Sequence, residues 1–435
     1  MRAVPVLLAL LASPALAHTQ QASNATAEHR AASLVLRHAT LLDGRDTLPQ
    51  RDVTIVIRDG RFVSVARDGG VLVGASDSVL DLRGAWVVPG LIDAHAHVGV
   101  DASASEGDNT RAAQWALDGG VTTLRSAWSS NYADVTLRDL FRAGSTRLPR
   151  LLAAGYQLFP LVPEHWARAF PTVTPLLADA TPADSALRLG PGRSWRLSGN
   201  PMAIDSVISV LAAHGVDWVK VYATGVAGLA SSDPLTPWLT EADLRQAVLA
   251  AKRHGLWVEA HAHGDAGILA AVRAGVRTIE HGTYASDTTL RLMRDRGTCL
   301  VPTLSVWDDM VGSPDSALRV RARSMRASAE DAVRRARDIG VPVIAGTDNF
   351  YLSGSRRLGS GLVALARAGL SPSEALLSAT SRAARCLEQH DRLGAIAPGF
   401  EADLLVLDGD PRAELERLGA PRLVVVGGRV VLDRR

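Results

Sequence analysis

Lysine is almost absent from this chain of 435 residues: Lys220 and Lys252 are the only two, and arginine supplies the other basic side chains. Basic and acidic residues nearly cancel, at 47 and 45, and no block of Lys or Arg forms a nucleic-acid footprint. We therefore expect no nucleic-acid partner. A lysine in a chain that otherwise uses arginine is also more informative than usual.

Cysteine is nearly absent too, since Cys299 and Cys386 are the only two and lie far apart in the sequence. So few cysteines cannot form a disulfide framework. The sequence favours two buried thiols and leaves a single bridge open.

Long hydrophobic runs are missing except at the N-terminus, where an apolar run extends from Ala3 to Ala12. Met1-Arg2 precedes it, and Ala15 and Ala17 follow it in an Ala-x-Ala cleavage pattern. This order is typical of a secretory signal peptide over residues 1–17, which predicts a secreted or periplasmic mature chain. The run is too short for a permanent span and no second run follows, so we expect no stable membrane insertion.

With 47% hydrophobic residues the chain can bury a large core, and its pattern changes along its length. After a flexible lead-in over residues 18–32, residues 52–58 and 61–66 alternate around the turn Asp59-Gly60, as in a hairpin. Strand-like segments recur near the C-terminus, at residues 402–407, 423–426 and 429–432. Neither end has enough strands for its own core, so we predict a small β-sandwich formed from residues 33–88 and 393–435.

Between these segments, short apolar strands alternate with helical stretches, which is typical of βα units. Helices are expected over residues 241–254, 266–274 and 373–387. Eight units match a closed (β/α)8 TIM barrel over residues 89–392, whose active site lies at the carboxyl ends of its strands. The fold class is thus α/β, and the predicted strands are Leu91–His97, Val121–Ser126, Arg150–Ala154, Trp218–Tyr222, Trp257–His261, Thr278–His281, Cys299–Thr303 and Val343–Asp348.

Polar side chains stand at the carboxyl ends of several of these strands. His95 and His97 end the first one, and side chains at positions i and i+2 of a strand project from the same face. Imidazole is the commonest protein ligand for zinc, so this pair has the spacing of a metal site. Further candidate ligands at strand ends are Lys220, His261, His281 and Asp348.

Each of these residues has an ordinary explanation when it is taken alone. His281 fits a hydrogen-bonded core histidine, Asp348 a helix N-cap, and Lys220 a side chain whose amine reaches solvent. Their joint occurrence at strand ends favours one shared site. Lys220 is the most informative, because a buried lysine can lose its proton and react as an amine, whereas arginine stays protonated.

The pattern His-x-His, Lys, His, His, Asp at the ends of strands one, four, five, six and eight resembles the amidohydrolase superfamily. Within it, the chain is similar to the binuclear zinc branch of Xaa-Pro dipeptidases, imidazolonepropionase-like amidohydrolases and secreted carboxypeptidase-type enzymes. The resemblance covers nearly the whole mature chain from about Ser33, and its most specific phrases are Val88–His97, Ala260–Gly264, Ile279–Gly282 and Pro398–Leu404.

The resemblance implies a role for each candidate residue. His95, His97 and Asp348 would hold the first of two zinc ions, or other divalent ions, and His261 and His281 would hold the second. An N6-carboxylated Lys220 would bridge both ions, because carboxylation gives the amine two anionic oxygens. A hydroxide between the metals would attack an amide carbonyl, with Asp348 as the catalytic residue that passes the proton to the departing nitrogen.

The chain departs from the branch near the substrate and not in the metal ligands. Ser126 follows Arg125 where the branch usually has aspartate, and Ala223-Thr224-Gly225 stands where Ser-Gly-Gly is common. Glu280 precedes a candidate ligand, and strand alternation would turn it the opposite way, so we expect it to have a structural role behind the barrel.

The expected substrate is a small N-acyl amino acid or dipeptide with a hydrophobic residue and a free C-terminal carboxylate. A long insertion over residues 155–200 carries Trp166, Phe170 and Trp195, which either line the pocket or only pack the insertion. Candidate contacts to the carboxylate are Tyr222, His263, Arg356 and Arg357, and a supporting or surface role fits His263 equally well.

Two alternatives to an amidohydrolase stay open at this point. The first is a lactonase or phosphotriesterase-type hydrolase on the same metal centre, which a substrate panel separates from a peptidase. The second is a non-catalytic binding protein, which the complete ligand set disfavours. The sequence also leaves the oligomeric state open, a homo-oligomer included.

Overall fold

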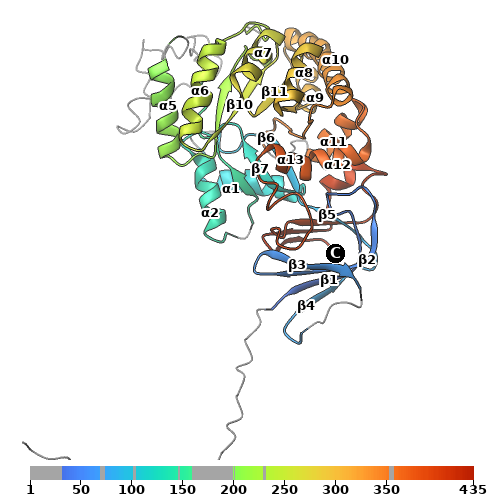
Figure 1. The fold of residues 1–435 in the computed structure, drawn as a ribbon. Helices are drawn as coiled ribbons and strands as arrows, with labels where there is room; N and C mark the ends of the chain where they lie inside the picture. Colours follow the sequence, from blue (N-terminus) through green and yellow to red (C-terminus); the bar gives the residue numbers. More distant parts are fainter. Residues whose placement is uncertain are drawn as a thin grey trace, which may run out of the picture. The chain divides into compact units, whose positions relative to one another are not determined.

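Strands from both ends of the chain lie in one sheet of the computed structural model (Figure 1). The structure describes residues 32–68, 74–100, 104–145, 147–158, 199, 201–228, 232–351 and 357–435. The predicted signal peptide and nearly all of the predicted lead-in lie outside these ranges. The described residues belong to one unit, Ala32–Arg435.

The terminal sheet has eight strands in the order β15-β14-β13-β5-β1-β2-β3, with β4 paired to β1. Strand β5 joins the two ends of the chain, because it runs parallel to β1 and antiparallel to β13. Side chains from both ends, such as Leu36, Ile55 and Val406, share one buried core. The two termini thus pair as predicted, within a single hydrogen-bonded sheet. Its strands are β1 (Leu34–Leu41), β2 (Gln50–Arg58), β3 (Arg61–Arg67), β4 (Ser78–Asp81), β5 (Trp86–Pro89), β13 (Leu404–Leu407), β14 (Leu423–Val426) and β15 (Arg429–Asp433).

The central part of the chain contains two parallel sheets, ordered β6-β7-β8 and β9-β10-β11-β12. Trp218 N donates to Ala153 O at 3.0 Å, which joins the two sheets. Residues 343–349 take the eighth position, since Ile344 N donates to Leu300 O and Ala94 N donates to Ala345 O. This is the strand order of a (β/α)8 barrel, with isolated bridges in place of a ladder at the eighth position. The barrel strands are β6 (Leu91–Ala96), β7 (Val121–Ser126), β8 (Arg150–Leu152), β9 (Trp218–Tyr222), β10 (Trp257–Ala262), β11 (Thr278–His281) and β12 (Cys299–Val301).

Helices follow the barrel strands, and α10 shows why such segments are helical. Its buried residues recur every three or four positions, as in Ala322, Met325 and Ala329, so that one face packs inward. The side chain of Asp315 caps its first turn, and Gly340 ends it with a positive φ of 93°. The helices are α1 (Glu106–Asp118), α2 (Ala133–Arg142), α5 (Pro201–Ala213), α6 (Glu241–Arg253), α7 (Asp265–Ala274), α8 (Asp287–Arg296), α9 (Val306–Val311), α10 (Ser316–Ile339), α11 (Leu358–Arg367), α12 (Pro372–Ser378) and α13 (Ser381–Cys386), with a 3-10 turn η2 (Leu415–Gly419).

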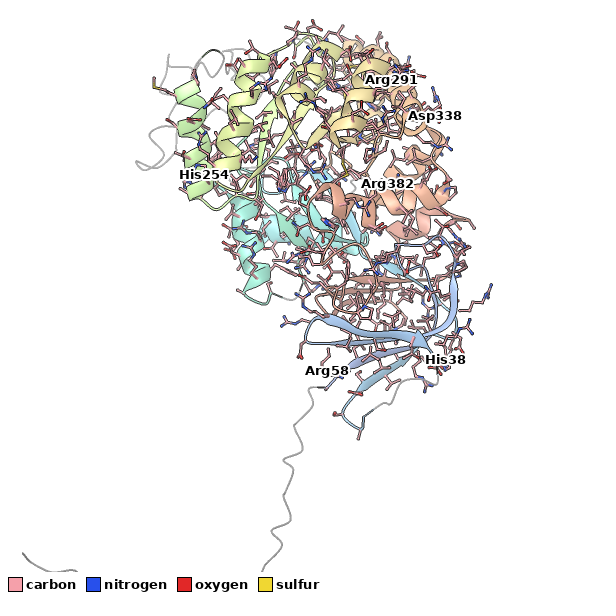
Figure 2. All side chains as sticks on the ribbon, viewed as in Figure 1. His38, Arg58, His254, Arg291, Asp338 and Arg382 are labelled. Atoms are coloured by element: carbon pink, nitrogen blue, oxygen red, sulfur yellow. A yellow bond between two sulfur atoms is a disulfide. The ribbon has the colours of Figure 1, made fainter. Side chains whose placement is uncertain are left out.

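The outer faces of these helices are charged. Arg291 of α8 and Asp338 of α10 stand on this face, exposed to solvent (Figure 2). Among the residues that the structure describes, no helix is long and apolar enough to cross a membrane.

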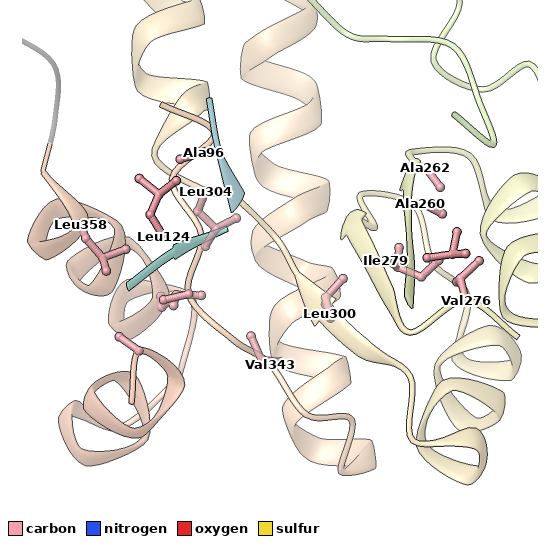
Figure 3. Packing of buried hydrophobic residues seen from close by; sticks show 14 of the residues in the cluster. Ala96, Leu124, Ala260, Ala262, Val276, Ile279, Leu300, Leu304, Val343 and Leu358 are labelled. Carbon is pink, nitrogen blue, oxygen red and sulfur yellow. The ribbon is translucent and has the colours of Figure 1, made fainter. Parts of the chain in front are cut away.

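Alternation along the strands separates the apolar core from the polar barrel interior. Ala260 and Ala262 of β10 belong to the same buried cluster as Ile279 of β11 (Figure 3). Because strand side chains alternate between faces, Glu259 and His261 project to the other side of β10. The candidate ligands therefore face the interior while their neighbours pack against the helices.

Gly90 marks the passage from the terminal sheet to the barrel, between β5 and β6. A Cβ atom at this position would lie 2.1 Å from Thr122 Oγ1, far closer than van der Waals contact. Only glycine lets the chain pass β7 at this distance. The start of the strand that carries His95 and His97 is thereby fixed against its neighbour.

The two cysteines form a disulfide, and the preference for buried thiols was wrong. Cys299 begins β12 and Cys386 ends α13, at a sequence separation of 87. Both are at most 2% exposed. The bridge fixes α13 to the amino-terminal end of a barrel strand.

We expect the double substitution Cys299→Ala and Cys386→Ala to lower the free energy of unfolding by about 2–5 kcal/mol, because the bridge closes a long loop in the unfolded chain. Urea unfolding of the two proteins measures the difference. Reductant should lower the stability of the unchanged protein by a similar amount and leave the double variant unaffected. Equal urea midpoints for both proteins would show that the bridge contributes no stability.

Candidate metal centre

The strand ends bring the predicted ligands into one buried pocket. His95, His97, Lys220, His261, His281 and Asp348 all line a cavity of about 240 Å³. The ring centroids of His95 and His281 are 5.5 Å apart, and those of His261 and His281 are 4.6 Å apart. Residues separated by up to 253 positions in the sequence thus meet at the carboxyl ends of the barrel strands.

One group of possible ligand atoms surrounds Asp348. Its Oδ1 lies 2.9 Å from His97 Nε2 and 3.3 Å from His95 Nε2. Ligand atoms of His95, His281 and Asp348 all lie within 4.8 Å of one another. A carboxylate and imidazole nitrogens at this separation suit a divalent cation.

A second group adjoins the first and shares His281 with it. Ligand atoms of His261, His263 and His281 also lie within 4.8 Å of one another. His263, which the sequence left between substrate contact and a supporting role, therefore stands among the candidate ligands. Its Nδ1 lies 2.8 Å from Thr283 Oγ1. Two adjacent groups with a common histidine match a binuclear centre.

Hydrogen bonds on the far side of two rings show which nitrogen is left for a metal. His95 Nδ1 lies 2.5 Å from Glu280 Oε2, and since an ionised carboxylate only accepts, Nδ1 carries the hydrogen and Nε2 keeps its lone pair. His261 Nε2 donates to Gly225 O at 3.1 Å, which leaves Nδ1 with the lone pair. Such outer partners orient metal-binding histidines.

Burial keeps four of the site's histidines in the form that binds metals. Burial lowers the pKa of His97, His261 and His281, and it lowers the pKa of His263 to about 3. Burial would also lower the pKa of His95, but Glu280 and Asp348 raise it. Neutral imidazole is the ligand form. His97 Nδ1 is also buried without a hydrogen-bond partner in the described part of the chain. The donor set therefore fits two divalent ions.

Lys220 lies inside the barrel with 1% of its surface exposed. Its Nζ is 5.5 Å from the ring centroid of Tyr222. Burial lowers the pKa of Lys220, although the carboxylates of Glu259 and Glu280 act in the opposite direction. The uncharged amine is thereby favoured, and this is the form that can react with carbon dioxide.

The predicted position of Glu280 was wrong: its side chain lies inside the barrel against His95 and not behind it. Its carboxylate also accepts from Arg125 Nη2 at 2.8 Å, and this guanidinium is within 3.1 Å of Glu259 Oε2. Burial alone would raise the pKa of Glu280, but Arg125 and His95 hold it at about 2. The ionised carboxylate of Glu280 thus accepts a hydrogen bond from His95 Nδ1 and holds the orientation of the ring.

Backbone conformation explains why alternation fails here. His281 has a φ of 70°, in the left-handed region that residues other than glycine rarely adopt. The strand therefore turns at its end, and the consecutive residues Glu280 and His281 both reach the interior. Asp348 has a φ of 57°. Strained backbone of this kind gathers at functional sites.

The remaining pocket wall is apolar and differs in part from the prediction. Tyr222 and His263 line the cavity as expected, and the Tyr222 hydroxyl donates to Gln157 Oε1 at 2.6 Å. Arg356 lies outside the described residues, as do Trp166, Phe170 and Trp195 of the predicted insertion. The other lining residues are Val226, Ala227, Gly228, Val306, Trp307, Met310 and Phe350.

Arg357 does not reach this pocket, so its predicted contact with the substrate was wrong. It precedes α11, and its Nη1 donates to Gly419 O at 2.6 Å and to Asp118 O at 3.3 Å. A basic residue that the sequence analysis missed is Arg321 of α10. Its Nη1 donates to Ala227 O at 3.3 Å, beside the cavity.

Trp307 is another pocket residue that the sequence analysis missed. It is 1% exposed, and its Nε1 is buried without a hydrogen-bond partner in the part of the chain that the structure describes. A signal for it existed: Trp307 follows the seventh predicted strand, on the face where barrel active sites form.

Comparison with known proteins agrees with this architecture. A model of the amidohydrolase family matches residues 86–431. An uncharacterized protein of Mycobacterium tuberculosis is 30% identical over 373 residues, which cover 82% of this chain and 88% of that protein. Ochratoxinase of Aspergillus niger is 26% identical over 410 residues, which cover 90% and 85% of the two chains. The crystal structure of a Xaa-Pro dipeptidase with bound methionine in the active site is similar with a TM-score of 0.78 and 26% identity, over 92% of this chain and 99% of that one.

These similarities confirm the predicted TIM-barrel fold class and the resemblance seen in the sequence. The family match covers most of the chain. It begins at β5, the strand of the terminal sheet that precedes the barrel, and ends within β15. The chain therefore belongs to the amidohydrolase family, as a metal-dependent hydrolase that acts on carbon–nitrogen bonds.

Proposed function

We propose that this protein is an exported amidohydrolase with two zinc ions, which cleaves the amide or peptide bond of a dipeptide or N-acyl amino acid. The observation that carries the proposal is the pair of ligand groups that share His281 in one buried pocket. The similarity to a Xaa-Pro dipeptidase and to ochratoxinase supports an amide substrate. Among the described residues that line the pocket, no feature favours a lactone or a phosphotriester.

His95, His97 and Asp348 would hold one ion, and His261 and His281 the other. Two divalent ions supply Lewis acidity, which polarises the scissile carbonyl and makes water more acidic. Asp348 accepts the proton of the attacking water and returns it to the departing nitrogen, because its carboxylate faces the same space as the ligand nitrogens.

A carboxylated Lys220 would complete the centre. The six side chains bring one carboxylate, from Asp348, to balance the charge of two divalent ions. A second anion on Lys220 would reduce this imbalance. The low exposure of Lys220 protects such a group from hydrolysis by bulk water.

The apolar wall and the free donor of Trp307 suit a substrate with a hydrophobic residue beside a carboxylate. Hydrophobic side chains pack against Val306 and Met310, while Trp307 Nε1 has no acceptor of its own. We therefore propose that Trp307 Nε1 donates to the substrate carboxylate, next to Tyr222 and with the charge of Arg321 nearby.

The deciding assay compares dipeptides with a free C-terminal carboxylate with the corresponding C-terminal amides. We expect the acids to be hydrolysed faster, since a hydrogen bond to a charged group contributes about 1.5–3 kcal/mol, on the order of 10–100-fold in kcat/KM. Trp307→Phe should remove most of this preference. Trp115→Phe is the matched control, because Trp115 Nε1 is also buried and unpaired but does not line the pocket. Equal rates for acids and amides would rule out carboxylate recognition.

Export is the remaining part of the proposal. The Cys299–Cys386 bridge supports it, because disulfides persist mainly in oxidising compartments. N-terminal sequencing of the protein from the periplasm or the medium should begin near His18. A chain that begins at Met1 would contradict signal peptide cleavage.

A further inference from the structure

A second cavity, of about 390 Å³, lies at the opposite end of the barrel from the candidate metal centre. Cys299 and Val343, which line it, stand at the start of β12 and of the eighth barrel segment, whereas the metal ligands stand at strand ends. No residue lines both cavities. The amidohydrolase reaction therefore does not explain this second cavity.

The lining of this cavity is strongly basic, with four arginines and one glutamate. Two of the arginines are balanced by carboxylates. Arg277 Nε donates to Glu388 at 2.7 Å, and Arg337 Nε lies 3.6 Å from Glu374. The other two, Arg382 and Arg385 of α13, have no ion pair with any described residue.

Arg382 is the more informative of these two side chains (Figure 2). It is partly buried, and its one hydrogen bond within the described chain is a long one, from Nη1 to Val343 O at 3.5 Å. Burial lowers the pKa of Arg382, with Glu374 opposing. Because arginine keeps its proton at ordinary pH, this partly buried charge gains most from an added anion.

Another part of the lining is apolar, formed by Val341, Pro342, Val343, Leu370 and Leu377, and Glu374 and Ser381 complete its polar part. A cavity with arginines in one part and apolar side chains in another suits a ligand that has both an anionic group and an apolar body. We propose that this cavity binds a small organic anion, whose carboxylate or phosphate pairs with Arg382 and Arg385 and whose apolar body packs on Leu370 and Leu377. Planar guanidinium groups bind both kinds of oxyanion through paired hydrogen bonds.

The disulfide contributes to this site, because Cys299 and Cys386 are themselves part of the lining. The bridge holds α13, and with it Arg382 and Arg385, against the start of β12. Arg277 Nη2 also donates to Arg385 O at 3.0 Å. The helix that carries the two arginines is thus held in place before a ligand arrives, which reduces the ordering cost of binding.

Calorimetric titration of the metal-loaded full chain at constant ionic strength tests the proposal, with benzoate, phenyl phosphate, benzyl alcohol and inorganic phosphate as probes. We expect the two aromatic anions to bind and benzyl alcohol to bind at least tenfold more weakly. Tighter binding of phenyl phosphate than of benzoate assigns the site to a phosphate group, and the reverse assigns it to a carboxylate. Inorganic phosphate that binds as tightly as phenyl phosphate would overturn the role of the apolar lining.

Anions can also bind to metal ions at the other end of the barrel. Variants of the second cavity therefore show whether the probes bind there. Arg382→Gln should weaken the aromatic anions at least tenfold, and Arg382→Lys should retain part of the affinity. Arg291→Gln, at an exposed arginine of α8, is the control and should change nothing. Unchanged melting temperature and turnover show that each variant is folded. Equal affinity of Arg382→Gln and the unchanged protein, or no binding of either aromatic anion, would overturn the proposal.

Discussion

Lys220→Ala should lose both bound metal and nearly all turnover. Partners that only support a metal ligand typically contribute 10–100-fold to activity, so removal of a bridging ligand should exceed about 100-fold in kcat/KM. Elemental analysis should fall clearly below the about two zinc ions per chain expected of the unchanged protein. Both effects follow if Lys220 carries the anion that offsets the charge of the ions.

Rescue distinguishes a missing bridge from a misfolded barrel. A short carboxylic acid such as propionate fits the space that the Lys220 side chain leaves, and it restores a carboxylate to that space. Partial recovery of turnover and metal in its presence is therefore expected, and a chemically similar alcohol should not act. Lys252→Ala is the matched control, since the only other lysine is exposed in the last turn of α6. Full metal content and turnover in Lys220→Ala without added acid would eliminate the bridging role.

The strand periodicity explains why most of the candidate site could be found in the sequence. Glu259 and His261 are two residues apart within β10, and His97 directly follows β6, two residues after His95, so strand alternation accounts for their shared direction. Parallel strands of a barrel bring their carboxyl ends to one face, which then gathers residues that are distant in sequence. The grouping of the candidate ligands needed no information beyond pattern and spacing.

The predictions that were wrong concern side chains whose direction depends on tertiary contacts, which a local sequence pattern does not contain. Glu280 reaches His95 in step with the alternation of β11, and His281 also faces the interior because it adopts a left-handed backbone, which no spacing rule predicts for histidine. Arg357 is held by carbonyls of Asp118 and Gly419, which lie far from it in the sequence. The pairing of the two cysteines likewise depends on where α13 docks.

Packing around His95 shows how tertiary contacts fix the position of a candidate ligand that the sequence pattern only identifies. Gly346 lies in the eighth barrel segment, where a Cβ atom would come within 2.5 Å of Val301 Cγ1 and 2.9 Å of His95 Cβ. The segment therefore approaches β6 and β12 closely, and Asp348 N donates to His95 O at 2.7 Å. Asp348 reaches His95 and His97 because the glycine two positions earlier leaves room for this approach.

Asp348→Asn should lower kcat by at least about 100-fold with little change in KM, because a positioned proton-transfer group typically contributes 10²–10⁴-fold. Burial by itself would raise the pKa of Asp348, but the neighbouring rings of His95 and His97 hold it well below its usual range. If two metal ions are bound, so weak a base accepts a proton only from water that they have made more acidic, which would couple its role to the metal centre. Asparagine keeps the size of the side chain and an oxygen that can face His97, but it cannot take up the proton.

Metal content decides how a loss of turnover in Asp348→Asn is interpreted. A variant that keeps about two ions per chain and loses kcat has lost proton transfer, whereas a variant that loses its metal has lost a ligand. Asp338→Asn, at an exposed carboxylate of α10, is the matched control and should leave kcat, KM and metal content unchanged. A change confined to KM, with kcat and metal content intact, would refute the assignment, since a group that acts only in the transition state does not change substrate binding alone.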